Sequence, residues 1–332
     1  MNAAAADLHA HDGPVLALAG GIGGAKLALG LSRILSPGGL LVVANTGDDF
    51  EHLGLSISPD LDTLMYTLAG INNPETGWGL RSETWTFMAA LRALGGETWF
   101  QLGDGDLATH VERTRRLASG EPLSRITEDF CRRLGVHTKI LPMSDDAVRT
   151  RVRTLEGWLA FQDYFVRRRC EPAVTELVYE GAAAARPHRD FMAALADTRL
   201  RAIVICPSNP FLSIDPILAL PRVREALIAC SAPVVAVSPI VGGRAVKGPT
   251  AKMMRELGLP VTAAAVARHY QDILDGYLVD HRDADVVCSG IKIASAATLM
   301  TTLADRETLA CEVLAFADAL RRSRAETAGA SA

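Results

Sequence analysis

The sequence contains no lysine or arginine between Ile34 and Leu80, although this stretch is rich in acid. Five carboxylates lie close together in it: Asp48, Asp49, Glu51, Asp60 and Asp62. Two unit charges ~4 Å apart repel by about 4 kcal/mol at the effective dielectric of a protein surface. Because no base nearby in the sequence can neutralise these side chains, we expect a bound cation to do so. The absence therefore predicts a Mg²⁺ and substrate loop.

Concentrated positive charge is also missing from the chain as a whole. Its lysines and arginines are scattered, the net charge is −4 and the pI is about 6.1. A protein that binds duplex nucleic acid is expected to carry a basic stripe, so nucleic acid is not an expected partner. The six cysteines are far apart, with no C-x-x-C pair and no histidine at metal spacing. This pattern is typical of reduced, structural cysteines in a cytoplasmic protein.

Long apolar segments are absent as well. No run approaches the ~18 to 20 uncharged apolar residues that a membrane span requires. The residues before Gly13 lack a basic segment followed by a long apolar stretch, so we do not expect a signal peptide. These two absences predict a cytoplasmic protein with no membrane partner.

The composition that is present indicates an α/β fold. A chain of 332 residues that is 49% hydrophobic can bury a large core, either as one domain or as a domain with an insertion. We predict helices at 82–94, with Ser82 as N-cap, and at 122–135, 156–169 and 306–320. Short apolar runs predict mostly parallel strands at 15–19, 40–44, 98–102, 136–141, 201–206, 233–237 and 285–288. We further predict a nucleotide- and metal-binding half (12–120), an insertion or cap (121–195) and a second half completing the same sheet (196–325).

A glycine-rich turn follows the first predicted strand. It contains Gly20, Gly21, Gly23 and Gly24, with Lys26 on the helix that follows. Glycines let backbone N–H groups approach a phosphate, and a helix N-terminus supplies partial positive charge for it. The turn is neither a P-loop nor an intact dinucleotide fingerprint, because Lys26 stands where the third glycine belongs. Phosphate binding is one interpretation, and a tight turn that only packs helix against strand is the other.

Two later turns carry groups suited to a nucleotide diphosphate. Ser208 and Asn209 lie between two prolines after the strand predicted at 201–206. Gly242 and Gly243 form a second glycine turn after the strand predicted at 233–237, with basic residues beside it. A diphosphate could lie between the two glycine turns. For Ser208 and Asn209 the alternative is a plain turn.

The four aspartates of the acidic stretch are our candidate catalytic residues. Asp48 and Asp60 are the candidate metal ligands, because Mg²⁺ takes one or two carboxylates and completes its shell with water and phosphate oxygens. Asp49 and Asp62 could then hold a hydroxyl group or act as base. The alternative is that Asp60 caps a helix and the other carboxylates are solvated.

Several polar and aromatic residues outside this stretch could bind a ligand or have a purely structural role. Trp85 could stack on a ligand or fill the core, and Gln101 precedes a turn that could face the same cleft. His110 could contact a phosphate or lie on the surface. Three arginines alternate along a predicted strand and share one face, which suits a solvated face, a subunit contact or an anionic ligand; they are Arg149, Arg151 and Arg153.

Taken together, these motifs resemble the 2-phospho-L-lactate transferase family of coenzyme F-420 biosynthesis. The matching segments follow in order from Ala19 to Met254: GGIGGAKL, NTGDD, SPDLDT, GDGDLATH, LPMSDD, FQDYFV, CPSNPF, SPIVGG and KGPTAKMM. The resemblance implies a Rossmann-like three-layer α/β sandwich with a mostly parallel sheet and a smaller α/β insertion, in a homodimer.

The resemblance also implies an activity. A phosphoenolpyruvyl or 2-phospholactyl group would pass from a guanylyl-diphosphate donor to a hydroxyl of the deazaflavin FO, with Mg²⁺ present and GMP released. The metal would be held by Asp48 and Asp60, and Asp62 or Asp49 would orient the terminal ribityl hydroxyl of FO. The candidate FO-binding residues are then Asp62, Trp85, Gln101 and His110.

One position departs from the family pattern. The family commonly has Gly-Asp-Arg-Asp where this chain has Gly103-Asp104-Gly105-Asp106, so a cation is missing beside the predicted site. Either another base such as Arg113 replaces it, or the donor carries a different acid.

Two other functions are possible on this pattern. Nucleotide-sugar-binding regulators share the GGxGG opening and a Gly-Asp-Asp loop, but they are Gly/Ser-rich after that loop, where this chain has Phe50-Glu51-His52. A nicotinamide dehydrogenase is disfavoured by the broken fingerprint and by the acidic loop in place of a single ribose-binding carboxylate.

Overall fold

The computed structural model describes residues 13–246 and 248–330. Its centre is a seven-stranded sheet in which every neighbouring pair is parallel. The strand order is β14-β13-β10-β9-β1-β2-β5. The strands are β1 (Val15–Ala19), β2 (Leu40–Ala44), β5 (Lys139–Pro142), β9 (Ala202–Ile205), β10 (Val234–Val237), β13 (Gly276–Asp280) and β14 (Lys292–Ala296).

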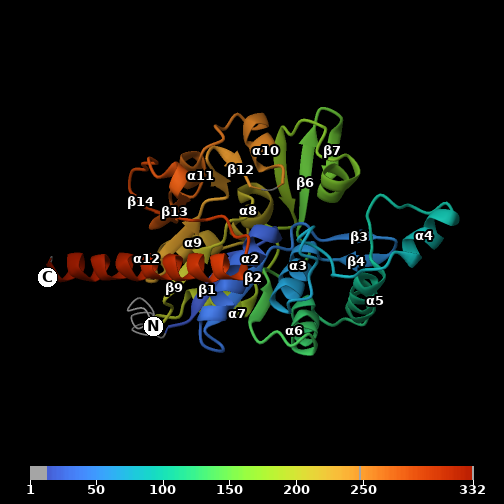
Figure 1. Cartoon of the computed structure of the whole chain (residues 1–332), viewed down its shortest axis with the longest axis horizontal. Helices are drawn as coiled ribbons and strands as arrows, with labels where there is room; N and C mark the ends of the chain where they lie inside the picture. The colour runs from blue at the N-terminus through green and yellow to red at the C-terminus, as the bar shows by residue number, and fades with distance from the viewer. Residues whose placement is uncertain (1–12, 247, 331–332) are drawn as a thin grey trace.

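Helices cover both faces of this sheet (Figure 1). In β1, Leu16 and Leu18 pack into one core and Val15 and Ala17 into the other, because successive side chains of a strand point to opposite faces. The Val15 face is covered by α2 (Gly21–Ile34), α3 (Pro59–Leu68), α6 (Leu123–Arg133) and the long α12 (Leu303–Ala330), and the Leu16 face by α7 (Arg189–Leu195), α8 (Asp215–Leu218), α9 (Val223–Ala229), α10 (Thr250–Glu256) and α11 (Ala263–His269). The result is the expected three-layer α/β sandwich.

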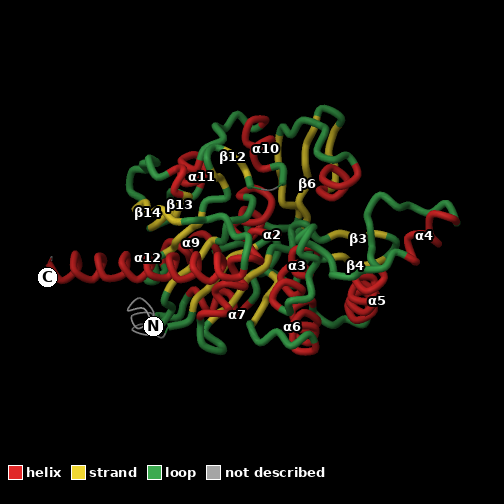
Figure 2. Tube along the Cα trace, viewed as in Figure 1, coloured by secondary structure: helices red, strands yellow, loops and turns green. Residues whose placement is uncertain are grey.

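Smaller elements extend from this core, and Figure 2 shows their strands outside the main sheet. An antiparallel hairpin pairs β3 (Phe50–His52) with β4 (Leu55–Ile57) and lies beside α5 (Asp104–Ala118), with α4 (Thr86–Ala93) farther out (Figure 1). A three-stranded sheet has the order β7-β6-β8. The remaining elements are β6 (Arg149–Thr154), β7 (Gly157–Ala160), β8 (Glu176–Glu180), β11 (Ile240–Val241), β12 (Arg244–Ala245), η2 (Asp163–Arg167), η3 (Pro210–Ile214) and η4 (His281–Asp283).

Four local predictions were wrong. Residues 98–102 form no strand, because Trp99 and Phe100 pack with Phe50 in an aromatic group instead of joining the sheet. Residues 285–288 form no strand either; the last two strands are β13 and β14. The helix at 82–94 begins only at Thr86, and Ser82, which has a left-handed φ of 55°, lies before it and is not its N-cap. Residues 156–169 are a strand, β7, followed by the short η2.

The strand order fixes where loops converge. From β1 the sheet grows through β2 and β5 on one side, and from β9 through β10, β13 and β14 on the other. In open parallel sheets, ligands bind beyond the carboxyl ends of the strands at the point where the order reverses, which here lies between β1 and β9. Strand β5 belongs to this main sheet, although its residues fall within the predicted insertion. No helix in residues 13–246 or 248–330 is long and apolar enough to cross a membrane.

Candidate functional site

The loops after β1 and β9 are in direct contact at this reversal point. The Ser208 hydroxyl donates to the Gly20 carbonyl oxygen at 2.8 Å and accepts from the Gly20 N–H at 3.3 Å. Asn209 caps η3 through its Oδ1, which accepts from the N–H groups of Phe211 and Leu212. The sequence-predicted glycine turn and the Ser208-Asn209 turn therefore form one edge of the same site.

Close packing accounts for three of the four glycines of the first turn. A Cβ at Gly20 would lie 2.5 Å from Asp60 Oδ2, and one at Gly24 would lie 2.7 Å from Ser208 Oγ. A Cβ at Gly23 would overlap the Pro207 carbonyl oxygen. Gly21 meets no such obstacle and has a left-handed φ of 62°. The packing interpretation thus holds for Gly20, Gly23 and Gly24, and phosphate binding by this turn stays a prediction.

The other phosphate-binding candidates lie in defined positions. Lys26 Nζ donates to the Met300 carbonyl oxygen at 2.7 Å, in the loop after β14. Gly242 and Gly243, with φ of 56° and 70°, form the exposed turn of the β11–β12 hairpin. The Gly242 N–H donates to Asp283 at 2.7 Å. Their part in phosphate binding also stays a prediction.

Asp60 lies in the first turn of α3 and points back at the glycine turn. Its Oδ1 accepts from the Gly21 N–H at 2.7 Å, and its Oδ2 accepts from Asn45 Nδ2 at 2.9 Å. Asn45 is itself fixed by the Gly47 N–H, which donates to its Oδ1 at 2.8 Å. Burial raises the pKa of Asp60 to about 6, against these hydrogen bonds. Asp60 is 6% exposed, and the Gly21 N–H that it accepts from belongs to the first residue of α2, so Asp60 satisfies a donor at the start of that helix while its metal role stays a prediction.

Asp48 and Asp49 are buried too, but each has an oxygen with nothing to bond. Asp49 Oδ2 accepts from the Ser58 hydroxyl at 2.8 Å, whereas Asp48 Oδ1 and Asp49 Oδ1 have no hydrogen-bond partner among the described residues. Burial, and next the charge of Asp60, raise the pKa of Asp48 well above its usual range. Burial raises the pKa of Asp49 to about 7, although Arg149 opposes the shift. Both oxygens are themselves buried, so their capacity to bond is unmet within the described residues, as in a site that a cation or a hydroxyl completes.

Asp62, in contrast, is neutralised within the chain. Arg113 on α5, 1% exposed, donates from Nη1 to Asp62 Oδ2 at 3.1 Å and from Nη2 to Asp62 Oδ1. Burial raises the pKa of Asp62, and the Arg113 charge opposes the shift. The expectation that the whole acidic set lacks a counter-ion is therefore wrong for Asp62. Its base comes from 51 positions farther along the chain.

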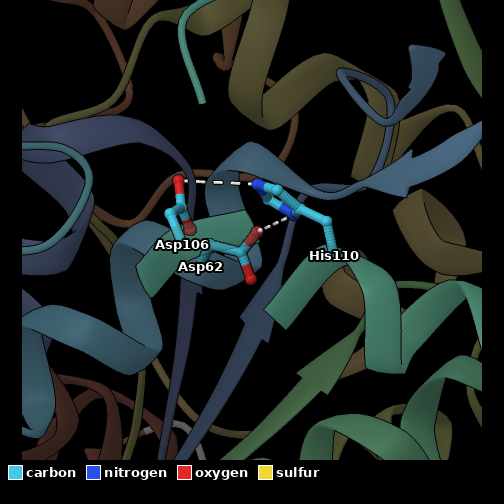
Figure 3. Close-up of side chains that lie close together, drawn as sticks. All are labelled: Asp62, Asp106 and His110. Atoms are coloured by element: carbon cyan, nitrogen blue, oxygen red, sulfur yellow. Dashed lines mark ion pairs between the residues drawn. The ribbon is translucent and has the colours of Figure 1, made fainter. Parts of the chain in front are cut away.

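The candidate His110 belongs to the same buried group (Figure 3). Its Nδ1 lies 3.7 Å from Asp62 Oδ2 and its Nε2 lies 3.4 Å from Asp106 Oδ2. Ligand atoms of Asp62, Asp106 and His110 are close enough together to hold a metal ion. Arg113 Nη1, however, lies 3.3 Å from His110 Nδ1 and already neutralises Asp62, so a second cation would meet repulsion there.

A cavity of about 910 Å³ opens beside Asp48 and Asp49, and both residues line it. Its volume is within the usual range for sites that bind small molecules. Aromatic side chains form part of the wall: Phe50, Trp99, Trp158 and Phe161. Trp158 and Phe161 come from the segment 156–169, whose aromatic residues the sequence suggested could wall a pocket or fill the core. The others come from loops and strands that only the fold brings together.

The predicted FO-binding residues are not among the described residues that line this cavity. They are Asp62, Trp85, Gln101 and His110. Trp85 is 43% exposed, Gln101 bonds to the Thr98 carbonyl oxygen at 2.6 Å, and His110 is buried. The arginine strand was predicted correctly as β6, and Arg149 and Arg151 face the cavity.

Comparison with known proteins shows the family of the chain. The family model described as 2-phospho-L-lactate transferase CofD matches residues 15–317. A phosphoenolpyruvate transferase of Streptomyces griseus is 42% identical over 317 residues, covering 92% of this chain and 99% of that protein. One of Mycobacterium tuberculosis is 40% identical, covering 86% of this chain and 93% of that protein.

Among solved structures, a protein of the UPF0052 family from Bacillus halodurans has the same fold. The TM-score is 0.60 at 15% identity, covering 91% of this chain and 98% of that one. This likeness concerns the fold alone, whereas the family match and the closer relatives indicate a transferase rather than a regulator. The chain belongs to the 2-phospho-L-lactate transferase family, whose enzymes serve coenzyme F-420 biosynthesis.

Proposed function

We propose that this transferase moves a phosphoenolpyruvyl group from a guanylyl-diphosphate donor to the deazaflavin FO and releases GMP. The observation that carries the proposal is the pair of unpartnered carboxylate oxygens on Asp48 and Asp49 at the wall of a large cavity. The choice of phosphoenolpyruvyl over 2-phospholactyl rests on the relatives named phosphoenolpyruvate transferase at 40 to 42% identity.

The residues fit a Mg²⁺ ion held by Asp48 and Asp60. Asp48 Oδ1 has no partner among the described residues, and the charge of Asp60 acts on Asp48. Gly21 and Asn45 orient the two oxygens of Asp60, each of which keeps a lone pair. When bound, Mg²⁺ neutralises charge on the phosphate oxygens, which is the main requirement of phosphoryl transfer.

Asp49 is better equipped than Asp62 to orient the acceptor hydroxyl. Asp49 Oδ1 is unpartnered and Asp49 lines the cavity, whereas both oxygens of Asp62 accept from Arg113. The FO hydroxyl oxygen would attack the phosphorus that carries the three-carbon acid. The bond from that phosphorus to the bridging oxygen breaks, GMP leaves with that oxygen, and Asp49 Oδ1 takes the hydroxyl proton.

The aromatic wall supplies a surface for the deazaflavin ring. The rings of Phe50 and Trp99 are in contact, and Trp158 and Phe161 come from β7 and the residue directly after it. Flat aromatic ligands gain stacking and apolar contact on such side chains. FO would thus bind with its ring on this wall and its ribityl chain toward Asp49.

A direct assay tests the proposal. Purified protein, Mg²⁺ and FO are mixed with the phosphoenolpyruvyl or the 2-phospholactyl guanylyl donor, and GMP and the mass of the deazaflavin product are measured. We expect GMP and product in equal amounts, fastest with the phosphoenolpyruvyl donor, and none with EDTA. GMP without a heavier deazaflavin, or full activity in EDTA, would contradict it. Light scattering of the same sample tests the homodimer that the family resemblance implies.

A further inference from the structure

Arg149 occupies a position in the cavity that the catalytic scheme leaves unexplained. It begins β6 and lines the cavity together with Asp48 and Asp49. Its Nη1 donates to the Val148 carbonyl oxygen at 2.7 Å. A guanidinium has five N–H donors, so most of those on Arg149 remain available to a ligand.

The other arginines on the cavity wall already have acidic partners. Arg151 pairs with Glu180 at 3.0 Å, and Arg168 pairs with Asp163 at 3.1 Å. Arg167 lies 3.8 Å from Asp163 and over the Trp99 ring. Within the described part of the chain, by contrast, Arg149 has no carboxylate oxygen within 4.0 Å. It is the cation of this wall that lacks an ion pair.

The charge of Arg149 nevertheless acts on the acidic end of the cavity. It holds the pKa of Asp49 below the value that burial alone would give. A ligand with its own carboxylate would be repelled by Asp48 and Asp49 unless a cation faced it. Guanidinium groups bind carboxylates with two parallel hydrogen bonds, a geometry that lysine cannot match.

We propose that Arg149 binds the carboxylate of the three-carbon acid on the donor and so selects donors that carry one beside the transferred phosphate. This inference rests on the proposed function. In both candidate donors the carboxylate is attached to the carbon that bears the phosphate ester oxygen, so it stays close to the reacting phosphorus. A site that holds this phosphorus near Asp48 and Asp49 therefore brings the carboxylate within the part of the cavity that Arg149 lines.

The competing role for Arg149 is that of a counter-ion for Asp49. The two roles differ in what they predict for a donor without a carboxylate. A counter-ion matters for every donor, whereas a carboxylate-binding residue matters only for donors that carry the acid. The experiment therefore compares two donors: GDP whose terminal phosphate is esterified to the 2-hydroxyl of lactate, and the isopropyl ester of GDP, in which a methyl group replaces the carboxylate.

The proteins to compare are the wild type, Arg149→Met, Arg149→Lys and the control Arg33→Met. Donor binding is measured by calorimetry, and KM and kcat by GMP release with FO. We expect Arg149→Met to weaken binding and raise KM for the lactate donor by ~10- to 100-fold, with little change in either quantity for the isopropyl donor. Any fall in kcat should be the same for both donors, because Asp49 loses the charge that opposes the rise of its pKa. Arg149→Lys should be intermediate, and Arg33→Met should change either donor less than about twofold, because Arg33 is paired with Glu307 and is not among the residues that line the cavity.

The possible outcomes test the carboxylate-binding role of Arg149 separately from the proposed transferase activity. If Arg149→Met weakens both donors equally, or if the wild type does not distinguish them, the carboxylate assignment is overturned while the transferase proposal stands. If the wild type transfers from neither the lactate nor the phosphoenolpyruvyl donor, the proposed function is overturned and the assignment with it. Loss of the wild-type preference for the lactate donor in Arg149→Met alone supports the assignment.

Discussion

Asp62 lies within fifteen positions of Asp48 and Asp49 and is about as deeply buried, yet its charge is compensated in a different way. Asp62 is closed off by Arg113, which bonds both of its oxygens, and His110 and Asp106 complete a buried group. Asp48 and Asp49 each keep an oxygen with no partner among the described residues. Among the described residues, Asp62 thus has an ion pair, whereas Asp48 and Asp49 have none.

This difference shows what marks a ligand site. Transferring a charged group from water to the protein interior costs several kcal/mol unless another charge or hydrogen bonds compensate. For Asp62 the hydrogen bonds and the charge of Arg113 compensate this cost within the fold, so the pair needs no ligand. The Asp48 and Asp49 group has no such ion pair among the described residues, and we propose that a cation or substrate from solution completes it. Burial alone would have treated the two alike.

The largest expected effect is on stability, and it comes from removing Arg113, the partner of Asp62. Arg113→Met leaves Asp62 buried and unpaired, which should reduce the free energy of unfolding by about 3 to 5 kcal/mol in urea denaturation. Adding Asp62→Asn should restore part of the loss, because the orphaned charge is removed. Arg115→Met on the same helix is the control, since Arg115 is exposed and pairs only with Glu112. Equal stability of Arg113→Met and wild type would contradict the conclusion that Arg113 compensates the buried charge of Asp62.

Substitutions at the proposed metal ligands Asp48 and Asp60 should affect turnover more than stability. Asp60→Asn and Asp48→Asn each remove one charge from the proposed metal site, so turnover should fall ~100-fold or more while the fold survives. Asp48→Asn is the more specific test. In Asp60→Asn the new amide NH₂ group would face the Gly21 N–H or the NH₂ group of Asn45, so a hydrogen bond would be lost as well. The exposed Glu75→Gln serves as control. Near-normal activity in either aspartate variant would remove its role in holding metal.

Mg²⁺ binding should change the stability of the protein through Asp48. If Asp48 needs an external cation, Mg²⁺ at 100 times its dissociation constant should stabilise the wild type by about 2.7 kcal/mol, and EDTA should reverse this. Thermal unfolding with and without Mg²⁺ measures the effect, independently of catalysis. Asp48→Asn should lose most of the gain. An unchanged Mg²⁺ effect in Asp48→Asn would mean that the ion binds elsewhere.

The central strands could be predicted from sequence because each is buried on both faces and therefore appears as a continuous apolar run. Runs such as Val15–Ala19 and Leu40–Ala44 need no knowledge of their neighbours. The sheet edge was harder. β14, Lys292–Ala296, has only intermediate or exposed residues before Ala296, and it is a strand because β13 pairs with it. Residues 285–288 contain the stronger local run but find no such partner.

The site divides in the same way. The charge pattern was enough to mark the acidic stretch with Asp48, Asp49, Asp60 and Asp62, because the absence of local bases is visible in the sequence, but it does not separate these aspartates by role. The pairing of Asp62 with Arg113 was not predictable, since a base 51 positions away becomes a neighbour only when α5 packs beside α3 and β4. The cavity wall shows the same limit: Trp99 and Trp158 lie in separate segments that only tertiary packing brings to one cavity.

The smallest expected effect concerns Gly105, where the family commonly has arginine. Gly105 is exposed in the first turn of α5, and its N–H donates to Glu83 Oε1 at 2.6 Å. A Cβ there would lie 3.0 Å from that oxygen and 3.1 Å from Leu80, a tight fit against the flexible end of Glu83. In Gly105→Arg the new guanidinium should therefore pair with Glu83, outside the residues that line the cavity. We expect the ratio of kcat/KM between phosphoenolpyruvyl and 2-phospholactyl donors to stay within about twofold of wild type, and stability to change by less than ~1 kcal/mol. A tenfold change in that ratio would make position 105 a selector of the donor acid and would mean that a cation on α5, as well as Arg149, reaches the substrate.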